Sequence, residues 1–213
     1  MPANLKIDAH DVLLVIDMQN DFMPGGALAV ARGDSIVPLV NRVAGQFGNV
    51  VLTQDWHPAG HASFASSHPG AKPYETTTMP YGAQVLWPDH CVQGGRGAQL
   101  HAGLKIDHAI LILRKGVNAR VDSYSAFAEA DRATSTGLAA LLKARGLKRV
   151  FACGLATDFC VAWSALDARS SGFESFVVED ACRGIDADGS LARAREQMEA
   201  AGVRRVLAAQ LSL

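Results

Sequence analysis

Hydrophobic residues along the chain gather in short runs, separated by longer stretches with a helical period. Five of these runs are Val12–Ile16, Val50–Thr53, Ile110–Leu113, Val150–Gly154 and Ser175–Val178. Each run is continuous rather than alternating, which is typical of strands that a parallel sheet buries on both faces. A weaker sixth run, Val206–Ala209, follows the charged Arg204 and Arg205, so we expect it at an edge of the sheet.

Helical patterns fill the spaces between the runs. They are Ser35–Phe47 with Asp34 as a cap, Thr136–Arg145, Asp158–Ser171 and Ser190–Ala201. The last three patterns are followed by Gly146, Gly172 and Gly202, and a glycine in that place commonly ends a helix. Because strands and helices alternate, we predict an α/β fold, with residues 1–213 as a single domain. Its sheet should be open and mostly parallel, with about six strands and helices on both faces.

The segment Pro58–Asp107 departs from this alternation. It is rich in Gly, His, Pro and Ser and has no sustained period. Loops of this length in a compact domain are usually functional or disordered. We therefore expect this segment to be a long loop that is either functional or disordered.

Composition and charge exclude several classes of protein. The chain has 213 residues, of which 49% are hydrophobic, enough for one core without help from disulfides. Its 20 basic and 21 acidic residues are spread along the chain, which argues against nucleic acid as a partner. No apolar run approaches the roughly 18 residues of a membrane span. We expect a soluble, cytoplasmic protein with no membrane partner, and the sequence leaves open whether it forms a homo-oligomer.

The cysteines do not suggest a disulfide framework. Cys91, Cys153, Cys160 and Cys182 form no C-x-x-C pair, and a cytoplasmic chain keeps its thiols reduced. Cys153 lies inside an apolar run, so we interpret it as a small buried hydrophobe.

Reactive side chains follow four of the predicted strands. Asp17 ends the first run, Asp55 and His57 follow the second, Lys115 follows the third, and Cys160 lies just beyond the fourth. Each has an ordinary structural explanation when taken alone. In open parallel sheets, however, ligands bind at the carboxyl ends of the strands. A carboxylate, an ammonium and a thiol at one edge can act as base, electrostatic stabiliser and nucleophile.

The position of Cys160 adds to this hypothesis. Thr157 or Asp158 could cap the following helix and place the thiol in its first turn, where the helix dipole favours a thiolate. Lys115 would also favour ionisation, whereas Asp17 would disfavour it but could accept the proton during attack. The balance of these effects is not determined by the sequence.

A metal site is a further hypothesis. In the extended segment that we expect there, Asp55 and His57 project from the same side of the chain. His90 could complete a set of two imidazoles and one carboxylate that leaves positions open for water or a ligand. On composition alone, other histidines are equally available, namely His61, His68, His101 and His108.

Five separated motifs, in order, resemble those of the isochorismatase-like cysteine hydrolases, and within that family the nicotinamidase branch. The matching segments are Val15–Phe22, Gln54–Pro58, Trp87–Val92, Arg114–Gly116 and Gly154–Val161. The resemblance extends over nearly the whole chain and implies a Rossmann-like, three-layer fold.

The resemblance also assigns roles to residues. Its catalytic Asp, Lys and Cys fall on Asp17, Lys115 and Cys160, and its metal ligands fall on Asp55, His57 and His90. A variable position of the metal shell falls on Ser63, with His61 close by, and we leave that ligand open.

Further implications of the resemblance concern the substrate pocket. It implies a cis peptide between Leu155 and Ala156, with the N–H groups of Ala156 and Cys160 forming an oxyanion hole. It also implies a pocket for a flat heteroaromatic ring, whose walls are formed by Phe22, Leu28, Trp87 and Tyr124, with Phe127 as an additional candidate.

The activity implied by the resemblance is hydrolysis of nicotinamide to nicotinate and ammonia through a cysteine thioester, in NAD salvage. Pyrazinamide and related carboxamides would be further substrates. One divalent metal is implied, zinc first with iron or manganese as alternatives, and no organic cofactor. Three other interpretations remain: a small-amide hydrolase without a metal, a hydrolase whose nucleophile is a metal-bound water, and a non-catalytic α/β binding module.

Overall fold

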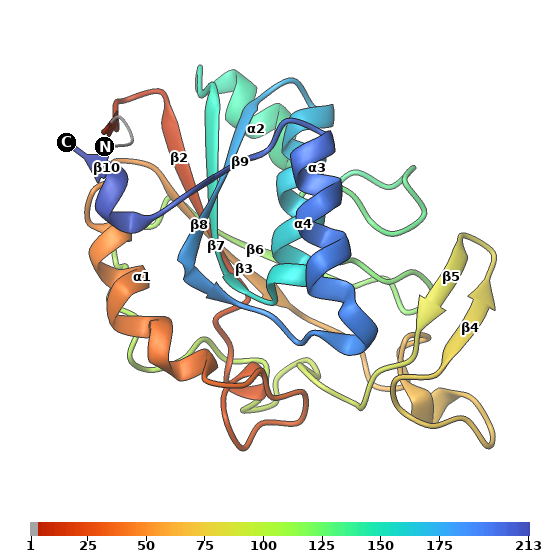
Figure 1. The fold of residues 1–213 in the computed structure, drawn as a ribbon. Helices are drawn as coiled ribbons and strands as arrows, with labels where there is room; N and C mark the ends of the chain where they lie inside the picture. Colours follow the sequence, from red (N-terminus) through yellow and green to blue (C-terminus); the bar gives the residue numbers. More distant parts are fainter. Residues whose placement is uncertain (1–3) are drawn as a thin grey trace.

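The fold is built on a parallel sheet of six strands in the order β6-β3-β2-β7-β8-β9 (Figure 1). A computed structural model describes residues 4–213, so residues 1–3 of the expected domain lie outside the described residues. The strands are β2 (Asp11–Ile16), β3 (Val50–Asp55), β6 (Leu111–Lys115), β7 (Arg149–Leu155), β8 (Glu174–Arg183) and β9 (Arg204–Val206). The α/β class and the parallel sheet are thereby confirmed.

Burial of the strands follows their place in the sheet. Every residue of β2 and β3 is buried, as the continuous apolar runs predicted. The prediction was wrong for β6, where Ile112 is 51% exposed, because β6 is an edge strand with one neighbour only. β9 forms the other edge, as expected, but the predicted bounds were wrong: the strand is Arg204–Val206, and Ala208 and Ala209 of the predicted run lie in a 3₁₀ turn.

Helices cover both faces of the sheet. They are α1 (Val37–Ala44), α2 (Leu138–Ala144), α3 (Ala162–Ser170) and α4 (Ser190–Ala200). In Figure 1, α1 lies on one side of the sheet, whereas α3 and α4 lie together on the other. Gly146, Gly172 and Gly202 follow their helices with positive φ angles of 71°, 91° and 75°, which confirms them as helix ends. No helix within residues 4–213 has both the length and the apolar character needed to span a bilayer.

The expected cap of α1 is wrong. A 3₁₀ turn, η2 (Gly33–Ile36), precedes the helix, and Asp34 lies inside that turn. The residue at the helix N-cap is Ile36, which provides no side-chain hydrogen bond. Asp34 therefore comes too early in the chain to cap α1.

The segment between β3 and β6 contains a hairpin that the sequence did not indicate. Its strands are β4 (Thr76–Met79) and β5 (Gly82–Val85), and in Figure 1 they project away from the main sheet. Four of their eight residues are exposed and only Gln84 is buried, so they show none of the apolar alternation by which a strand is found. A second small pair, β1 (Leu5–Lys6) with β10 (Leu211–Ser212), joins the two ends of the chain.

The strand order reverses between β2 and β7. From β2 the chain continues to β3 and β6 on one side, and later to β7, β8 and β9 on the other. Ligands of open α/β sheets bind where the order reverses, beyond the carboxyl ends of the strands. Gly154 allows the backbones of β7 and β2 to lie close together at this point, because a Cβ on it would lie 2.2 Å from the carbonyl oxygen of Ile16.

Candidate active site

Asp17 stands directly after β2 and is fully buried, with a φ of 48°, in the region that non-glycine residues seldom adopt. Its Oδ1 accepts a hydrogen bond of 2.5 Å from Thr53 Oγ1, and Oδ2 lies 2.8 Å from Lys115 Nζ. Among residues 4–213, no donor meets Oδ2 with the angles of a good hydrogen bond. This oxygen therefore has a lone pair available to accept a proton.

Lys115, the last residue of β6, lies between the reactive groups. Besides Asp17, its Nζ contacts Asp55 Oδ1 in a short hydrogen bond, the carbonyl oxygen of Ser123 at 2.9 Å and Cys160 Sγ at 3.4 Å. Burial alone would lower the pKa of Lys115, but the two carboxylates outweigh it and hold that pKa well above its usual value. The side chain is therefore a permanent buried cation.

Cys160 lies in a π-helical turn, η4 (Thr157–Val161), between β7 and α3. Burial is the main reason that the pKa of its thiol is raised well above the usual value; Lys115 opposes this, and Asp17 adds to it. Burial likewise raises the pKa of Asp17, although Lys115 opposes that shift. The thiol is thus neutral at rest, and Asp17 is a stronger base than an exposed aspartate.

The prediction that Thr157 or Asp158 caps this helix is wrong. The N-cap residue of η4 is Ala156, and no side chain caps the turn. The Asp158 carboxylate instead accepts the backbone N–H groups of Ile185 and Asp186, so it is not available to the turn itself. The pKa of the Cys160 thiol is raised, mainly by burial, and is not lowered as a capped helix terminus was expected to make it.

The peptide between Leu155 and Ala156 is cis, as the resemblance implied. Within the described part of the chain, the N–H group of Ala156 donates no hydrogen bond. Cys160 follows four residues later, in the same turn. An N–H group that lacks an acceptor beside the thiol fits the expected oxyanion hole, and that role remains a proposal.

Asp55, His57 and His90 converge at the end of β3. The Nε2 atoms of both histidines lie 3.7 Å from Asp55 Oδ2, and all three side chains are buried. Their other ring nitrogens are fixed by backbone carbonyls, His57 Nδ1 by Gly116 at 3.0 Å and His90 Nδ1 by Pro88 at 2.8 Å. If each Nδ1 carries the proton, both Nε2 lone pairs face the carboxylate. This donor set suits a divalent metal. The hydrogen bonds of the two Nδ1 atoms to backbone carbonyls would hold the imidazole rings in the orientation that a metal ligand needs.

The other candidate histidines are engaged elsewhere. His61 contacts Ser63 Oγ through Nδ1 at 2.8 Å and the carbonyl oxygen of Asn118 through Nε2 at 2.9 Å. His61 also forms a second close set with His57 and Asp122, but both of its ring nitrogens already have partners. His68, His101 and His108 bond to backbone groups of Ala62, Gly103 and Ala44. The structure therefore separates His90, which the motif resemblance had selected, from histidines that composition alone left equally available.

Asp55 belongs to both groups, because Oδ1 contacts Lys115 and Oδ2 faces the two histidines. Its backbone is held by Gln19, whose carboxamide accepts from the N–H of Asp55 and donates to its carbonyl, both at 2.8 Å. No role for Gln19 was predicted, although it lies in the matched segment Val15–Phe22. That position was the feature of the sequence by which it could have been found.

The shared position of Asp55 leads to a prediction. In metal-free protein, Asp55→Asn should lower stability by on the order of 1 to 3 kcal/mol, because it breaks a buried ion pair with Lys115. His90→Ala should cost less in the metal-free state, since it leaves that pair intact. Denaturant unfolding of both variants after metal chelation measures this difference. Equal stability of Asp55→Asn and the parent protein would contradict the bridging role of Asp55.

A small cavity joins the Cys160 thiol to the candidate metal site, because Cys160, Asp55 and His90 all line it. It is lined by Phe22, Leu28, Asp55, Trp87, His90, Asp122, Tyr124, Phe159, Cys160 and Ile185. The four residues expected in the substrate pocket all lie in this wall. Phe127 does not, because it packs against Phe173 in the core, with ring centroids 6.1 Å apart.

Three pocket residues were missed by the sequence analysis. Asp122 accepts a hydrogen bond of 2.7 Å from Gln84, which belongs to the unexpected hairpin. Phe159 packs edge-on against Trp87, with centroids 4.9 Å apart. Ile185 comes from the loop after β8. Phe159 adjoins Cys160 in a matched motif, which was a usable signal, whereas Ile185 had none.

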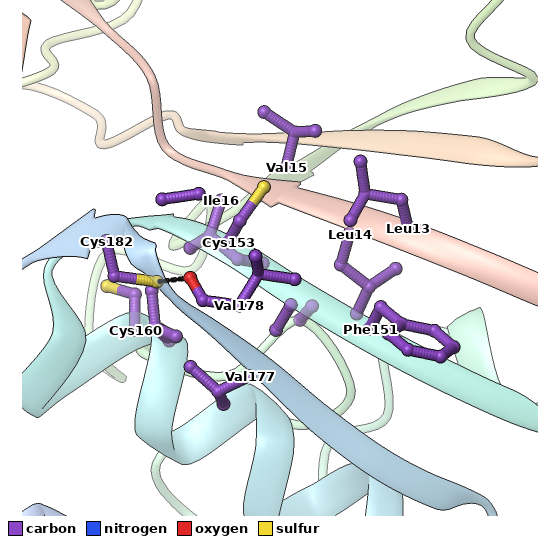
Figure 2. Close-up of a cluster of buried hydrophobic side chains, with 14 of the residues drawn as sticks. Leu13, Leu14, Val15, Ile16, Phe151, Cys153, Cys160, Val177, Val178 and Cys182 are labelled. Carbon is purple, nitrogen blue, oxygen red and sulfur yellow. Dashed lines mark hydrogen bonds between the residues drawn. The ribbon is translucent and has the colours of Figure 1, made fainter. Parts of the chain in front are cut away.

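The other cysteines lie in the core. All four thiols are free and buried. Figure 2 shows Cys153 among the apolar side chains of β2 and β7, and Cys182 donating to the carbonyl oxygen of Val178 at 3.3 Å. Burial raises the pKa of Cys153 well above its usual value. The interpretation of Cys153 as a small buried hydrophobe agrees with this environment.

Comparison with known proteins adds evidence of a different kind. The family model described as the isochorismatase domain matches residues 11–210. A nicotinamidase of Acinetobacter baylyi is 55% identical over 206 residues, which cover 97% of this chain and 96% of that protein.

Two solved structures extend the comparison. A nicotinamidase and pyrazinamidase structure from Acinetobacter baumanii has a TM-score of 0.94 at 55% identity, covering 95% of this chain and 98% of that one. The pyrazinamidase of Pyrococcus horikoshii, solved in complex with zinc, has a TM-score of 0.74 at 37% identity, covering 93% of this chain and 99% of that one.

Proposed function

The chain belongs to the isochorismatase family, and from that premise we propose that it hydrolyses nicotinamide to nicotinate and ammonia, a reaction of NAD salvage. The observation that carries the proposal is the single cavity, with aromatic walls, onto which both the Cys160 thiol and the Asp55, His90 pair open. A relative with 55% identity over nearly the full length is a nicotinamidase, which supports the same substrate. Ammonia release from nicotinamide by the purified protein, with its metal content measured in parallel, tests the proposal.

The reaction begins with proton transfer. Asp17 Oδ2 accepts the thiol proton of Cys160, and the resulting thiolate attacks the carboxamide carbon. The N–H groups of Ala156 and Cys160 stabilise the oxyanion of the tetrahedral intermediate. Asp17 then returns the proton to the amide nitrogen, the C–N bond breaks, and ammonia leaves a thioester on Cys160.

Hydrolysis of the thioester completes the cycle. Asp17 accepts a proton from a water molecule that attacks the thioester carbonyl, and it returns a proton to the sulfur as the C–S bond breaks. The carboxyl proton of the product passes to ammonia or to solvent, nicotinate leaves, and the thiol is restored. Lys115 remains protonated throughout, because two carboxylates hold its pKa well above the usual value, and it balances the charge that moves between Asp17 and Cys160.

Asp55, His57 and His90 would hold one divalent metal. When bound, the metal would offer a coordination position, direct or through water, to the ring nitrogen of the substrate. Zinc is supported by the zinc complex of the Pyrococcus horikoshii protein and by the two imidazoles and one carboxylate of the site. Iron and manganese accept the same ligands. Asp55 and His90 line the cavity, so the site lies at its wall.

A comparison of two substrates tests this role of the metal site. Replacing His57 or His90 by alanine should reduce metal content and raise KM for nicotinamide, with kcat falling as well, since a loosely held ring presents its amide poorly. Benzamide has the same carboxamide but no ring nitrogen, so it should be a poor substrate of the parent protein. The rate of benzamide hydrolysis should fall comparatively little further when His57 or His90 is replaced.

Thiol alkylation of the same variants gives a second measurement. Iodoacetamide should still modify Cys160, because His57 and His90 do not touch its sulfur. If benzamide and nicotinamide hydrolysis fall equally on removal of the metal, the ring-anchoring role should be dropped. Full activity of the metal-free protein would support the alternative interpretation, a small-amide hydrolase that needs no metal.

A further inference from the structure

A loop that lines the cavity is tied to the turn of the nucleophile by one buried carboxylate. We call residues 184–190, from the end of β8 to the first residue of α4, the strap. Ile185 of the strap lines the cavity that contains Cys160. Asp186 and Asp188 adopt positive φ angles of 58° and 48°, so the backbone of the strap bends sharply after Ile185. The shape of the strap must therefore be imposed by contacts with other segments.

Asp158 provides those contacts. Its Oδ1 accepts the N–H of Ile185 at 2.9 Å, and Oδ2 accepts the N–H of Asp186 at 2.8 Å together with the Ser190 hydroxyl in a short hydrogen bond. Asp158 is only 6% exposed. The strap packs closely here, because a Cβ added at Gly184 would lie 3.1 Å from Asp158 Oδ1. One side chain thus holds both ends of the strap.

The same turn of the chain carries the nucleophile. Asp158, Phe159 and Cys160 are consecutive in η4. Phe159 lines the catalytic cavity and also a second, outer groove, whose other lining residues include Asp158, Ser190 and Tyr74. Phe159 and Ile185 are both partly exposed, in contrast to the buried Phe22, Leu28 and Trp87 of the same wall. The cavity is therefore bounded toward the outer groove by Phe159, beside the strap.

From this geometry we infer that Asp158 is a positioning residue that sets the size of ring the cavity admits, by holding Ile185 of the strap against it. The inference deepens the proposed function and rests on it, since it concerns the same cavity. Asp158 touches neither Lys115 nor the Asp17 carboxylate, so it takes no part in proton transfer. Its effect reaches the substrate through Ile185.

A double-mutant cycle tests this path of action. Asp158→Ala and Ile185→Ala should each raise KM for nicotinamide by roughly tenfold, the usual cost of lost apolar contact in a small pocket, with a smaller fall in kcat. The KM of the double variant should be no higher than that of Asp158→Ala alone, because Asp158→Ala already removes the contact of Ile185 with the substrate ring. In both single variants, the kcat/KM for quinoline-3-carboxamide, which has a wider ring, should rise by roughly tenfold relative to the kcat/KM for nicotinamide.

Matched controls separate this role from simple loop support. Asp131 accepts the N–H groups of Ala133 and Thr134 and the Thr134 hydroxyl, which is the same set of donor types on a loop outside the cavity. Asp131→Ala should leave KM and ring preference unchanged. Ser190→Ala removes one of the three hydrogen bonds of Asp158, so it should give an intermediate effect even if Asp158→Ala folds poorly.

A measurement independent of substrate distinguishes failure of this inference from failure of the proposed function. The rate of Cys160 modification by a bulky maleimide, relative to iodoacetamide and followed by peptide mass mapping, should rise in Asp158→Ala, Ser190→Ala and Ile185→Ala. This holds even if the parent protein releases no ammonia from nicotinamide. Additive KM effects in the cycle, or an unchanged maleimide ratio in folded Asp158→Ala and Ser190→Ala, would overturn the inference.

Discussion

Cys160→Ala is expected to abolish amide hydrolysis, with a loss of turnover on the order of 10³-fold or more. The reason is that Cys160 Sγ lies 3.4 Å from Lys115 Nζ and within 4.8 Å of a carboxylate oxygen of Asp17, which can accept the thiol proton. No thioester forms without it. Ammonia release from nicotinamide at saturating concentration measures the effect, and an aromatic aldehyde such as nicotinaldehyde should form a thiohemiacetal on Cys160 in the parent protein only.

Cys153→Ala is the matched control for this substitution. Cys153 is a free, fully buried thiol of β7 that lies outside the cavity. Its replacement should leave turnover intact and cost at most about 1 to 2 kcal/mol of stability through lost packing. Substantial turnover by Cys160→Ala, or equal losses in both variants, would end the covalent mechanism.

Asp17→Asn is expected to reduce turnover by a factor on the order of 10² to 10⁴ while the protein stays folded. The substitution is nearly isosteric, so the hydrogen bond with Thr53 can persist, but the amide cannot accept the thiol proton. Burial raises the pKa of Asp17 in the parent protein, which makes the lost base a strong one. Steady-state kinetics with folding verified by circular dichroism measures the effect. Turnover by Lys115→Ala should also be severely reduced, because the substitution removes the positive charge that lies between the Asp17 and Asp55 carboxylates.

A carboxylate at the other end of β2 provides the control for Asp17→Asn. Asp11, the first residue of β2, is fully buried and bonds to Arg149 Nε at 2.5 Å, at the end of the sheet opposite the site. Asp11→Asn should lower stability without changing kcat. Near-normal turnover by folded Asp17→Asn would be incompatible with its role as the base.

The strands of the sheet were predictable because burial on both faces requires a continuous apolar run. β2, β3 and β7 satisfy this condition, and their runs were found within one or two residues. Errors arose where the condition fails. β6 is half exposed at an edge, and the β4–β5 hairpin is short and polar. Edge and hairpin strands take their stability from pairing and local turns, which leave little trace in hydrophobicity.

Local signals were also misleading for side chains that make distant contacts. Asp158 stood where a capping residue stands, yet its carboxylate bonds to Ile185, Asp186 and Ser190, 27 to 32 residues further along the chain. A capping pattern is a statement about neighbours in sequence, whereas a buried carboxylate binds whichever donors the fold brings to it. The role of Asp158 became visible only in the folded protein.

The sequence by itself determined the inventory of the site, because four strands of a parallel sheet end in Asp17, Asp55, Lys115 and the turn of Cys160, and parallel strands bring those ends to one edge. The tertiary structure decided how that inventory is connected. It brought His90 next to Asp55 and His57, as the motif resemblance implied, placed Asp55 between Lys115 and the two imidazoles, and lined the cavity with Phe159 and Ile185. The positions of the strands and of the residues at their ends follow from short-range patterns, but distances of 3 to 4 Å between side chains depend on how loops from distant parts of the chain pack together.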